Sequence, residues 1–243
     1  MDKSDILGVI PARMKSSRFP GKPLADIRGR PMVARVYEAA VKASTLTKVV
    51  VATDSPEIEE ACRDLDIPSI MTDTKHPTGT DRVAEVATKI KADIYVNIQG
   101  DEPLIEPDVI DEAVKGLISD SSFQVVNLCM AINRLTDLVD TTVPKVVKGP
   151  NGRAVFLSRC AIPYPKNPKA ANYFRQVCVY AFRPEALRKF SELSPGPIEA
   201  AEDIELLRFI EYGIPVRMME VRTNSFGVDT PADLERARRE WKP

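Results

Sequence analysis

A cationic loop between residues 11 and 23 is the first segment of the chain with a clear capacity for chemistry. It follows an apolar run at residues 6–10, and Gly21 and several small residues allow backbone N–H groups to approach a ligand closely. From residue 11 onward no acid occurs before Asp26, so the loop suits a nucleoside triphosphate. A solvated basic turn is the alternative, although prolines stiffen the loop. Its cations, four within ten residues, are Arg13, Lys15, Arg18 and Lys22.

Two aspartates in separate parts of the chain could hold a cation. Asp101 follows Gly100 just after a strand-like run, where a hard cation such as Mg²⁺ is commonly held by one or two carboxylates and substrate phosphates. Asp229 precedes Thr230 and a proline, so it could simply cap the last helix, and the first aspartate could belong to an ordinary turn. The capping and metal readings are compatible, because an aspartate at a helix start can also face a metal.

Composition excludes several other chemistries. The single histidine, His76, rules out a site with two or three histidine ligands and leaves little for a serine–histidine–aspartate triad. Neither a GxxxxGK[ST] loop nor a GxGxxG after the first strand is present. A net charge of -1 disfavours nucleic-acid binding. No apolar run is long enough for a membrane span, and neither a leader-like start nor clustered cysteines occur, so we expect a cytoplasmic protein with reduced thiols.

Short apolar runs alternate with helical patterns in the first half of the chain. This rhythm predicts a mostly parallel sheet with helices on both faces, in which ligands bind beyond the carboxyl ends of the strands. The loops after Ile10, Ala52 and Ile98 are therefore the candidate site loops. We expect strands at 6–10, 48–52 and 93–98, and helices at 31–43, from 56 after a cap at Ser55, at 78–90 and at 107–118.

The rhythm changes near residue 122, without a linker or an internal repeat. The whole chain, 1–243, is predicted to be a single three-layer α/β domain with a mostly parallel nucleotide-binding sheet and a smaller β-rich insertion. The second half is expected to contain strands at 123–132, 144–148, 154–157 and 176–183, and helices at 184–192, 200–212 and 231–241.

Five motifs, in order along nearly the whole chain, strongly resemble those of the 3-deoxy-manno-octulosonate (Kdo) cytidylyltransferases. The branch associated with capsules is the most similar, through segments 92–95 and 162–165. The five motifs are IPAR with SRFPGKPL (10–13 and 17–24), VATD (51–54), HPTGTDR (76–82), NIQGDEP (97–103) and GVDTP (227–231).

This resemblance implies an enzyme that couples CTP to the anomeric hydroxyl of an eight-carbon acidic sugar, giving a CMP-sugar and pyrophosphate. Arg13 and Lys22 would hold the triphosphate, Asp101 and Asp229 would hold Mg²⁺, and Arg13, Lys22 and Asp101 would be the catalytic residues. No side-chain base is then obligatory, because the metal can lower the pKa of the attacking hydroxyl. The CTP-binding residues would be Pro11, Ala12, Arg13, Ser17, Lys22, Thr78, Gly79, Thr80 and Arg82.

The acceptor side is implied less completely. Arg159 suits the sugar carboxylate and two acids suit its hydroxyls, although each could be ordinary surface charge. Residues 1–121 would mainly bind CTP, and 122–243 would mainly bind the acceptor and form homodimer contacts, in which Tyr164 and Tyr173 could take part. The acceptor-binding residues would be Gln99, Arg159, Gln176, Tyr180, Glu199 and Glu202.

Three departures from the family pattern all lie on the acceptor side. Gln176 stands where histidine is usual, Cys178 where glycine is usual, and Pro144 just before Lys145 is unusual. Glutamine can donate and accept hydrogen bonds but cannot become a cation. The acceptor could therefore be Kdo, a modified ulosonic acid or a small phosphonate acid. Two hypotheses remain: a CTP-binding paralogue without turnover, against which the two spaced carboxylates argue, and an unrelated α/β enzyme.

Overall fold

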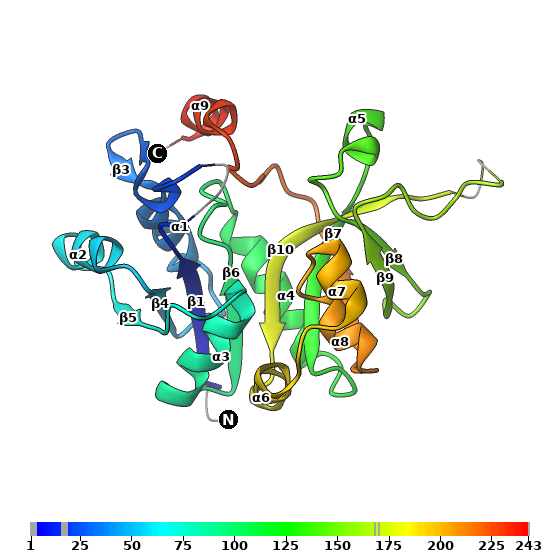
Figure 1. Ribbon diagram of the computed structural model, residues 1–243, viewed down its shortest axis with the longest axis horizontal. Helices are drawn as coiled ribbons and strands as arrows, with labels where there is room; N and C mark the ends of the chain where they lie inside the picture. The colour runs from blue at the N-terminus through cyan, green and yellow to red at the C-terminus, as the bar shows by residue number, and fades with distance from the viewer. Residues whose placement is uncertain (1–3, 16–18, 168, 170, 243) are drawn as a thin grey trace.

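The main sheet runs through the middle of the protein in the computed structural model, which describes residues 4–15, 19–167, 169 and 171–242. Its strand order is β11-β7-β10-β6-β1-β4-β5 (Figure 1). Strand β10 is antiparallel to both neighbours and the other neighbouring pairs on this path are parallel, so the sheet is mostly parallel, as expected. The strands are β1 (Ile6–Ala12), β4 (Lys48–Thr53), β5 (Ser69–Met71), β6 (Ile94–Ile98), β7 (Val125–Ala131), β10 (Phe174–Phe182) and β11 (Val216–Glu220).

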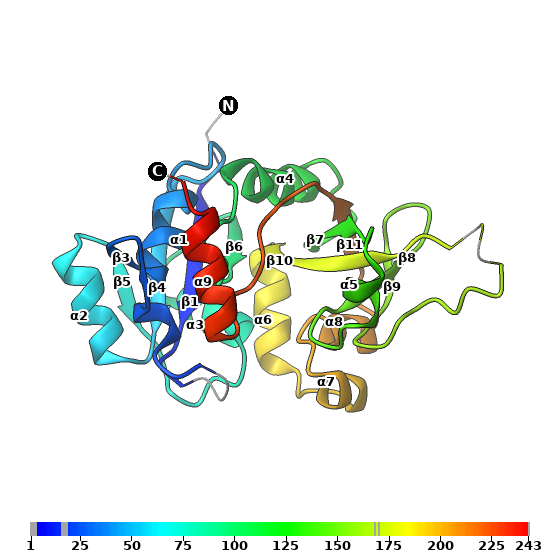
Figure 2. The ribbon, with the colours of Figure 1, turned by 90° about the horizontal axis from the view of Figure 1, so that it is seen from above.

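Helices cover both faces of this sheet, which explains why its central strands are continuous apolar runs. Every residue of β6 is buried. The residues of α1 (Met32–Ala40), α2 (Pro56–Asp64) and α4 (Pro107–Ile118) pack on one face, and those of α3 (Gly79–Lys89), α6 (Pro184–Glu192) and α8 (Leu207–Glu211) on the other. Figure 2 shows α4 and α6 on opposite sides of β10. The predicted three-layer α/β architecture is confirmed.

The strands of the second half are distributed differently from the predicted insertion. Strands β7 and β10 belong to the main sheet, and the small addition is the antiparallel pair β8 (Lys145–Lys148) and β9 (Ala154–Ser158). This pair continues from the first residues of β10, which project beyond the core (Figure 1). A change of register between Val177 and Tyr180 separates the projecting part of β10 from the part that pairs with β6.

Local sequence signals account for most helix boundaries. Ser55 caps α2 and Thr78 caps α3, each followed by helical residues as predicted. The single helix expected at 200–212 is wrong: the structure has α7 (Pro197–Glu202) and then α8, because Asp203 adopts a left-handed conformation with φ of 52° and ends α7. Strand β11 was not foreseen, and α5 (Leu135–Val139) is a further short helix.

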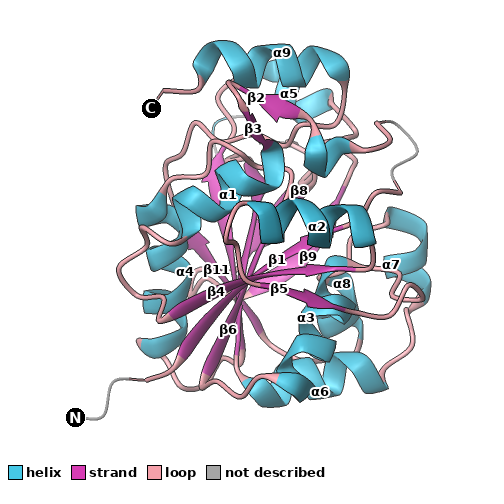
Figure 3. Ribbon diagram, turned by 90° about the vertical axis from the view of Figure 1, so that its left-hand side faces the viewer, coloured by secondary structure: helices cyan, strands magenta, loops and turns pink. Residues whose placement is uncertain are grey.

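The last helix lies against the segment that follows the cationic loop. Helix α9 (Pro231–Glu240) covers β2 (Asp26–Ile27) and β3 (Arg30–Pro31), as Figure 3 shows. Arg28 donates to the carbonyl of Arg238, and Arg238 donates to the carbonyl of Asp26. Because β2 follows the short 3₁₀-helix η1 (Lys22–Leu24), this contact holds the residues that precede α9 close to Lys22. Among the described residues no helix is both long and apolar enough to cross a membrane.

Candidate active site

A cleft of about 860 Å³ opens at the carboxyl ends of β1 and β6. Ten of the predicted site residues line it, which places residues far apart in sequence around one space. These are Pro11, Ala12, Arg13, Lys22, Thr78, Gly79, Arg82, Gln99, Asp101 and Asp229. The described lining does not include Thr80, Arg159, Gln176, Tyr180, Glu199 or Glu202, and Ser17 lies outside the described residues.

Two glycines shape this cleft. A Cβ on Gly100 would lie 2.7 Å from the carbonyl oxygen of Pro11, so glycine lets the ends of β6 and β1 approach closely. Gly21 has a φ of 74°, and its N–H donates to the carbonyl of Met14 at 3.1 Å, which closes the cationic loop. Lys22 then begins η1 and points its ammonium back to the floor of the cleft, where it meets two carboxylates.

Lys22 lies between the two predicted metal carboxylates. Its Nζ is 2.7 Å from Oδ2 of Asp101 and 3.2 Å from Oδ1 of Asp229. Burial favours the neutral amine and would lower the pKa of Lys22. The two carboxylates have the larger combined effect and raise this pKa above 10.5. The side chain therefore stays cationic and neutralises two acids that would otherwise repel each other.

The helix-cap reading of Asp229 and Thr230 is confirmed for Thr230. Its hydroxyl accepts from the N–H of Asp233, whose carboxylate accepts from the N–H of Thr230 in return. The N–H of Asp229 also donates to Asp233 at 3.2 Å. The backbone thus caps α9 while the Asp229 side chain reaches Lys22 in the cleft, so the cap does not occupy the Asp229 carboxylate.

The start of α3 forms another wall of the cleft. Carboxylates of the protein already accept hydrogen bonds from this helix start. Asp81 and Thr78 form a capping box, and Glu205 accepts from the N–H of Thr80 at 3.1 Å and from the hydroxyls of Thr78 and Thr80. Burial raises the pKa of Glu205. Thr80 itself is buried and accepts from Asn97. This helix start consequently presents a nearly neutral polar edge rather than an anion site.

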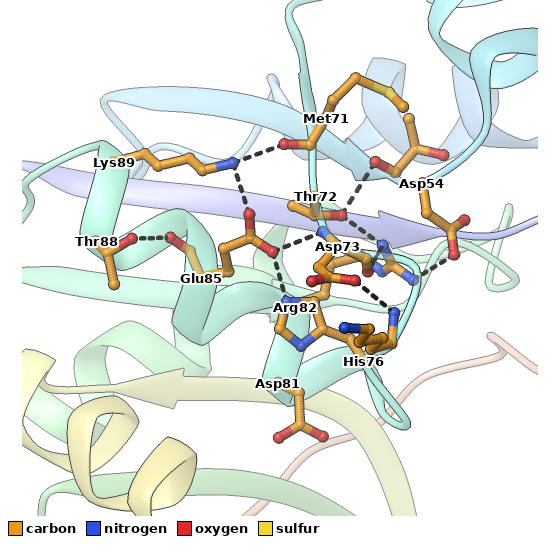
Figure 4. Close-up of polar contacts among 12 residues, drawn as sticks. Asp54, Met71, Thr72, Asp73, His76, Asp81, Arg82, Glu85, Thr88 and Lys89 are labelled. Carbon is orange, nitrogen blue, oxygen red and sulfur yellow. Dashed lines mark hydrogen bonds and ion pairs between the residues drawn. The ribbon is translucent and has the colours of Figure 1, made fainter.

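A network beneath α3 fixes Arg82 at the cleft (Figure 4). Arg82 is buried and donates to Asp54 at 3.1 Å and to the hydroxyl of Thr72. Glu85 holds the neighbouring loop, because it contacts His76 and accepts from the N–H of Asp73. Burial would raise the pKa of Glu85, but Lys89, the Asp73 N–H and His76 together lower it to about 2. Arg13 reaches the same loop, donating to the Pro77 carbonyl at 3.3 Å.

Two predicted acceptor residues form one unit beside the cleft. The carboxylate of Glu202 accepts from the hydroxyl of Ser158 and from the N–H of Arg159. The Arg159 guanidinium donates to the carbonyls of Glu202 and Asp203, and Asp203 lines the cleft. The break after α7 therefore places Arg159 and Glu202 next to the cleft.

The other predicted acceptor residues are more deeply buried. The Gln176 amide donates to Oδ1 of Asn127 at 3.0 Å and to the hydroxyl of Tyr180 at 3.3 Å, and burial raises the pKa of Tyr180 well above 10. Glu199 is only 5% exposed and makes a two-pronged ion pair with Arg208, at 2.7 and 2.8 Å. The structure does not bring the Glu199 carboxylate to the cleft.

Sequence reasoning missed Glu205, whose carboxylate supports the wall at Thr78 and Thr80. The available signal was spacing: Glu199, Glu202 and Glu205 are three residues apart. A continuous helix would place them along one face. The break at Asp203 instead directs them to different partners.

A mostly parallel α/β sheet with a cationic loop, a glycine at a strand end and two carboxylates beyond it is an arrangement suited to binding a nucleotide at the carboxyl ends of the strands. The chain matches the cytidylyltransferase family over residues 7–220. The 3-deoxy-manno-octulosonate cytidylyltransferase of Escherichia coli is 44% identical over 95% of this chain and 93% of its own length. That of Oleidesulfovibrio alaskensis is 45% identical over 94% and 93%.

One solved structure is closely similar throughout. A CMP:2-keto-3-deoxy-manno-octonic acid synthetase complexed with CTP superposes with a TM-score of 0.93. It is 43% identical, and the match covers 97% of this chain and 98% of that one. The chain belongs to the 3-deoxy-manno-octulosonate cytidylyltransferase family, which confirms the resemblance found in its motifs.

Proposed function

We propose that this protein transfers CMP from CTP to the anomeric hydroxyl of Kdo and releases pyrophosphate. The sugar oxygen forms a bond to the α-phosphorus, the bond from that phosphorus to the pyrophosphate oxygen breaks, and the hydroxyl proton passes to solvent. The observation that carries the proposal is the cleft itself: it has cations on one wall, two carboxylates at its floor and a neutral polar edge opposite. It lies in a chain 43% identical to a synthetase complexed with CTP.

The triphosphate belongs on the cationic side of the cleft. Arg13 and Lys22 line the cleft beside the closely packed ends of β1 and β6, and Lys15 also lines it. Positive charge placed there neutralises the phosphates and stabilises the charge that develops on the leaving pyrophosphate. Since this reaction demands mainly positioning and neutralisation, a chain with one histidine can perform it without a side-chain base.

Mg²⁺ fits the floor of the cleft. Although no cluster of three or more metal-ligating side chains occurs in the described part of the chain, Mg²⁺ typically uses one or two carboxylates and completes its shell with substrate phosphates and water. Asp101 and Asp229 already converge on one cation, the Lys22 ammonium. When bound, the metal would polarise the α-phosphate and lower the pKa of the attacking hydroxyl.

The cytosine belongs at the start of α3. A neutral, hydrogen-bonding edge suits a base better than a phosphate, and Thr78 and Gly79 face the cleft there together with Ala12 and Arg82. Thr80 would act from behind, since it joins Asn97 and Glu205 to the helix start. Thr80 would therefore support the cytosine-binding wall, whereas the family motif implied that Thr80 contacts CTP directly.

The acceptor belongs beside Asp203, where Gln99 lines the cleft and Arg159 lies close by. Arg159 would attract the sugar carboxylate, and Glu202 would orient Arg159 or a hydroxyl. Gln176 and Tyr180 would shape this end from below. Glu199 would act through Arg208. A modified ulosonic acid or a phosphonate acid is the second candidate acceptor, because Gln176 cannot supply a positive charge.

The protein would work as a cytoplasmic homodimer, with residues 122–243 providing the contact. Three exposed apolar side chains support this: Leu135 and Val139 on α5, and Tyr164, which is 86% exposed on the segment before β10. Figure 2 shows the described residues of this segment extending away from the main sheet. Sedimentation of the purified chain would show a dimer, and Tyr164→Asp would shift it toward monomer.

Pyrophosphate release from CTP and Mg²⁺, measured with and without Kdo, tests the function. We expect release that depends on both Kdo and Mg²⁺, with Asp101→Asn as the inactive blank. Normal activity in Asp101→Asn would remove that residue from the metal site. Bound CTP without release would instead move the search to amino-ulosonates and phosphonates, while absence of CTP binding would reject the enzyme class.

A further inference from the structure

Asp229 is carried by a segment without regular structure. Residues 221–229 connect β11 to α9 and contain neither helix nor strand in the structure. The connection crosses the molecule from β11 to α9 (Figure 2). A free segment of this length would hold a carboxylate poorly, because each unrestrained residue adds conformational entropy. Something must therefore fix Asp229 opposite Asp101.

The segment is fastened to the loop between β6 and α4 at three places. The hydroxyl of Thr223 and the N–H of Asn224 donate to the carboxylate of Glu106, the latter at 3.1 Å. The hydroxyl of Ser225 donates to Oε2 of Glu102 at 2.7 Å. The N–H of Val228 donates to the carbonyl of Asp101 at 2.8 Å.

The middle attachment is the most deeply buried. Ser225 is 2% exposed and Glu102 is 7% exposed. The N–H of Cys178, in the irregular part of β10, also donates to Glu102, and Arg175 donates to the carbonyl of Ser225 at 3.1 Å. Glu102 therefore joins three segments: its own loop, the irregular part of β10 and the connection that carries Asp229.

We propose that Glu102, through Ser225, is a positioning residue that sets the separation of Asp101 and Asp229 and thereby the affinity of the site for a hard divalent cation. Glu102 directly follows Asp101, and Ser225 precedes Asp229 by four residues, so a shift at their hydrogen bond moves one carboxylate relative to the other. The inference rests on the proposed function, in which these two aspartates hold the metal.

A purely stabilising role is the alternative, and the chain offers a matched control for it. The hydroxyl of Ser44 donates to Oδ2 of the buried Asp111, also at 2.7 Å. Ser44 precedes β4 and so lies at the opposite end of the sheet from the cleft. Ser44→Ala and Ser225→Ala thus remove the same kind of hydrogen bond to a buried carboxylate, but only Ser225→Ala does so beside the site.

The experiment is a calorimetric titration of Mn²⁺ into the CTP-loaded protein in the absence of acceptor. We expect Ser225→Ala to weaken Mn²⁺ binding by about tenfold, the equivalent of one hydrogen bond. Ser44→Ala should bind Mn²⁺ like the parent while both variants lose thermal stability. CTP binding in a metal chelator should be unchanged. Glu102→Gln, which still accepts from Ser225, should lose less affinity than Ser225→Ala.

Equal Mn²⁺ affinity in Ser225→Ala and the parent would overturn the inference, as would an equal loss in Ser44→Ala. If Ser225→Ala does not fold, Ser225→Cys, which offers Glu102 a weaker donor at the same position, provides the same comparison. Asp101→Asn distinguishes failure of the positioning role from failure of the metal site itself. If it abolishes Mn²⁺ binding while Ser225→Ala has no effect, only the positioning role fails. If it binds Mn²⁺ normally, the metal site itself is wrong.

Discussion

The ammonium of Lys22 lies 2.7 Å from the carboxylate of Asp101, although the two residues are 79 positions apart. Only 13% of the Lys22 side chain is exposed, yet the paired carboxylates keep its pKa above 10.5. The lysine is thus a permanent cation at the floor of the cleft. It holds the carboxylates near each other before any substrate enters, and it can contact phosphate without first gaining a proton.

We expect Lys22→Met to lower kcat/KM for CTP by about 10²–10³, the usual cost of removing one donor to charge that develops in the transition state. Steady-state pyrophosphate release measures this. Lys42→Met, on a lysine after α1, is the control and should change little. Activity in Lys22→Met within a few-fold of the parent would show that other cations carry the triphosphate.

Gly100→Ala should destabilise the protein by about 1–3 kcal/mol, because its Cβ would lie 2.7 Å from the Pro11 carbonyl and the backbone would have to move. The matched control is Gly227→Ala, also close to the site, where a Cβ meets nothing within 4 Å. Thermal unfolding should separate the two variants. An unchanged melting temperature in Gly100→Ala would mean that the two strand ends separate easily.

The stability contributed by Glu85 should depend on pH. Its pKa is about 2 in the folded protein and near 4.5 when unfolded, so its charged form stabilises the fold above pH 4.5. That contribution is lost as the pH falls from 4.5 toward 2. Glu85→Gln should therefore be destabilised at pH 7 and match the parent near pH 2, as chemical denaturation can show. A difference that stays constant with pH would contradict this assignment.

Gln176→His tests whether the altered acceptor side reflects another acceptor. If Kdo is the substrate, kcat/KM for Kdo in this variant should stay within about threefold of the parent value. The reason is that the substitution exchanges about one neutral hydrogen bond for another. KM for CTP should not change. Gln176→Ala, which loses the contacts to Asn127 and Tyr180, is the comparison and should be worse with any acceptor. A large gain with Kdo in Gln176→His would indicate that the natural acceptor is a different acid.

Elements whose boundaries are encoded locally could be predicted from the sequence. The helices at 107–118 and 184–192 have the predicted bounds, because a proline begins each one and apolar spacing fixes its buried face. The helix predicted at 78–90 is α3, with Thr78 as its cap rather than its first helical residue. The cleft at the strand ends followed from the alternation of strands and helices, which fixes where loops converge.

Features that depend on distant partners could not be predicted. Strand β10 joins the main sheet only because β6 and β7 accept it as an antiparallel neighbour, and residue types in β10 do not specify that choice. An aspartate at position 203 does not by itself specify the end of a helix, yet its left-handed conformation separates Glu202 from Glu205. Glu199 was expected to bind a sugar hydroxyl, but its carboxylate forms an ion pair with the buried Arg208 instead.

The most direct test of the account is ³¹P NMR of the protein with CTP, Mg²⁺ and Kdo. We expect one CMP–Kdo phosphodiester signal and one pyrophosphate to appear for each CTP consumed, and neither to appear without Kdo. An unchanged CTP spectrum in the presence of Kdo, with a CMP conjugate formed only from another acid, would contradict the central claim.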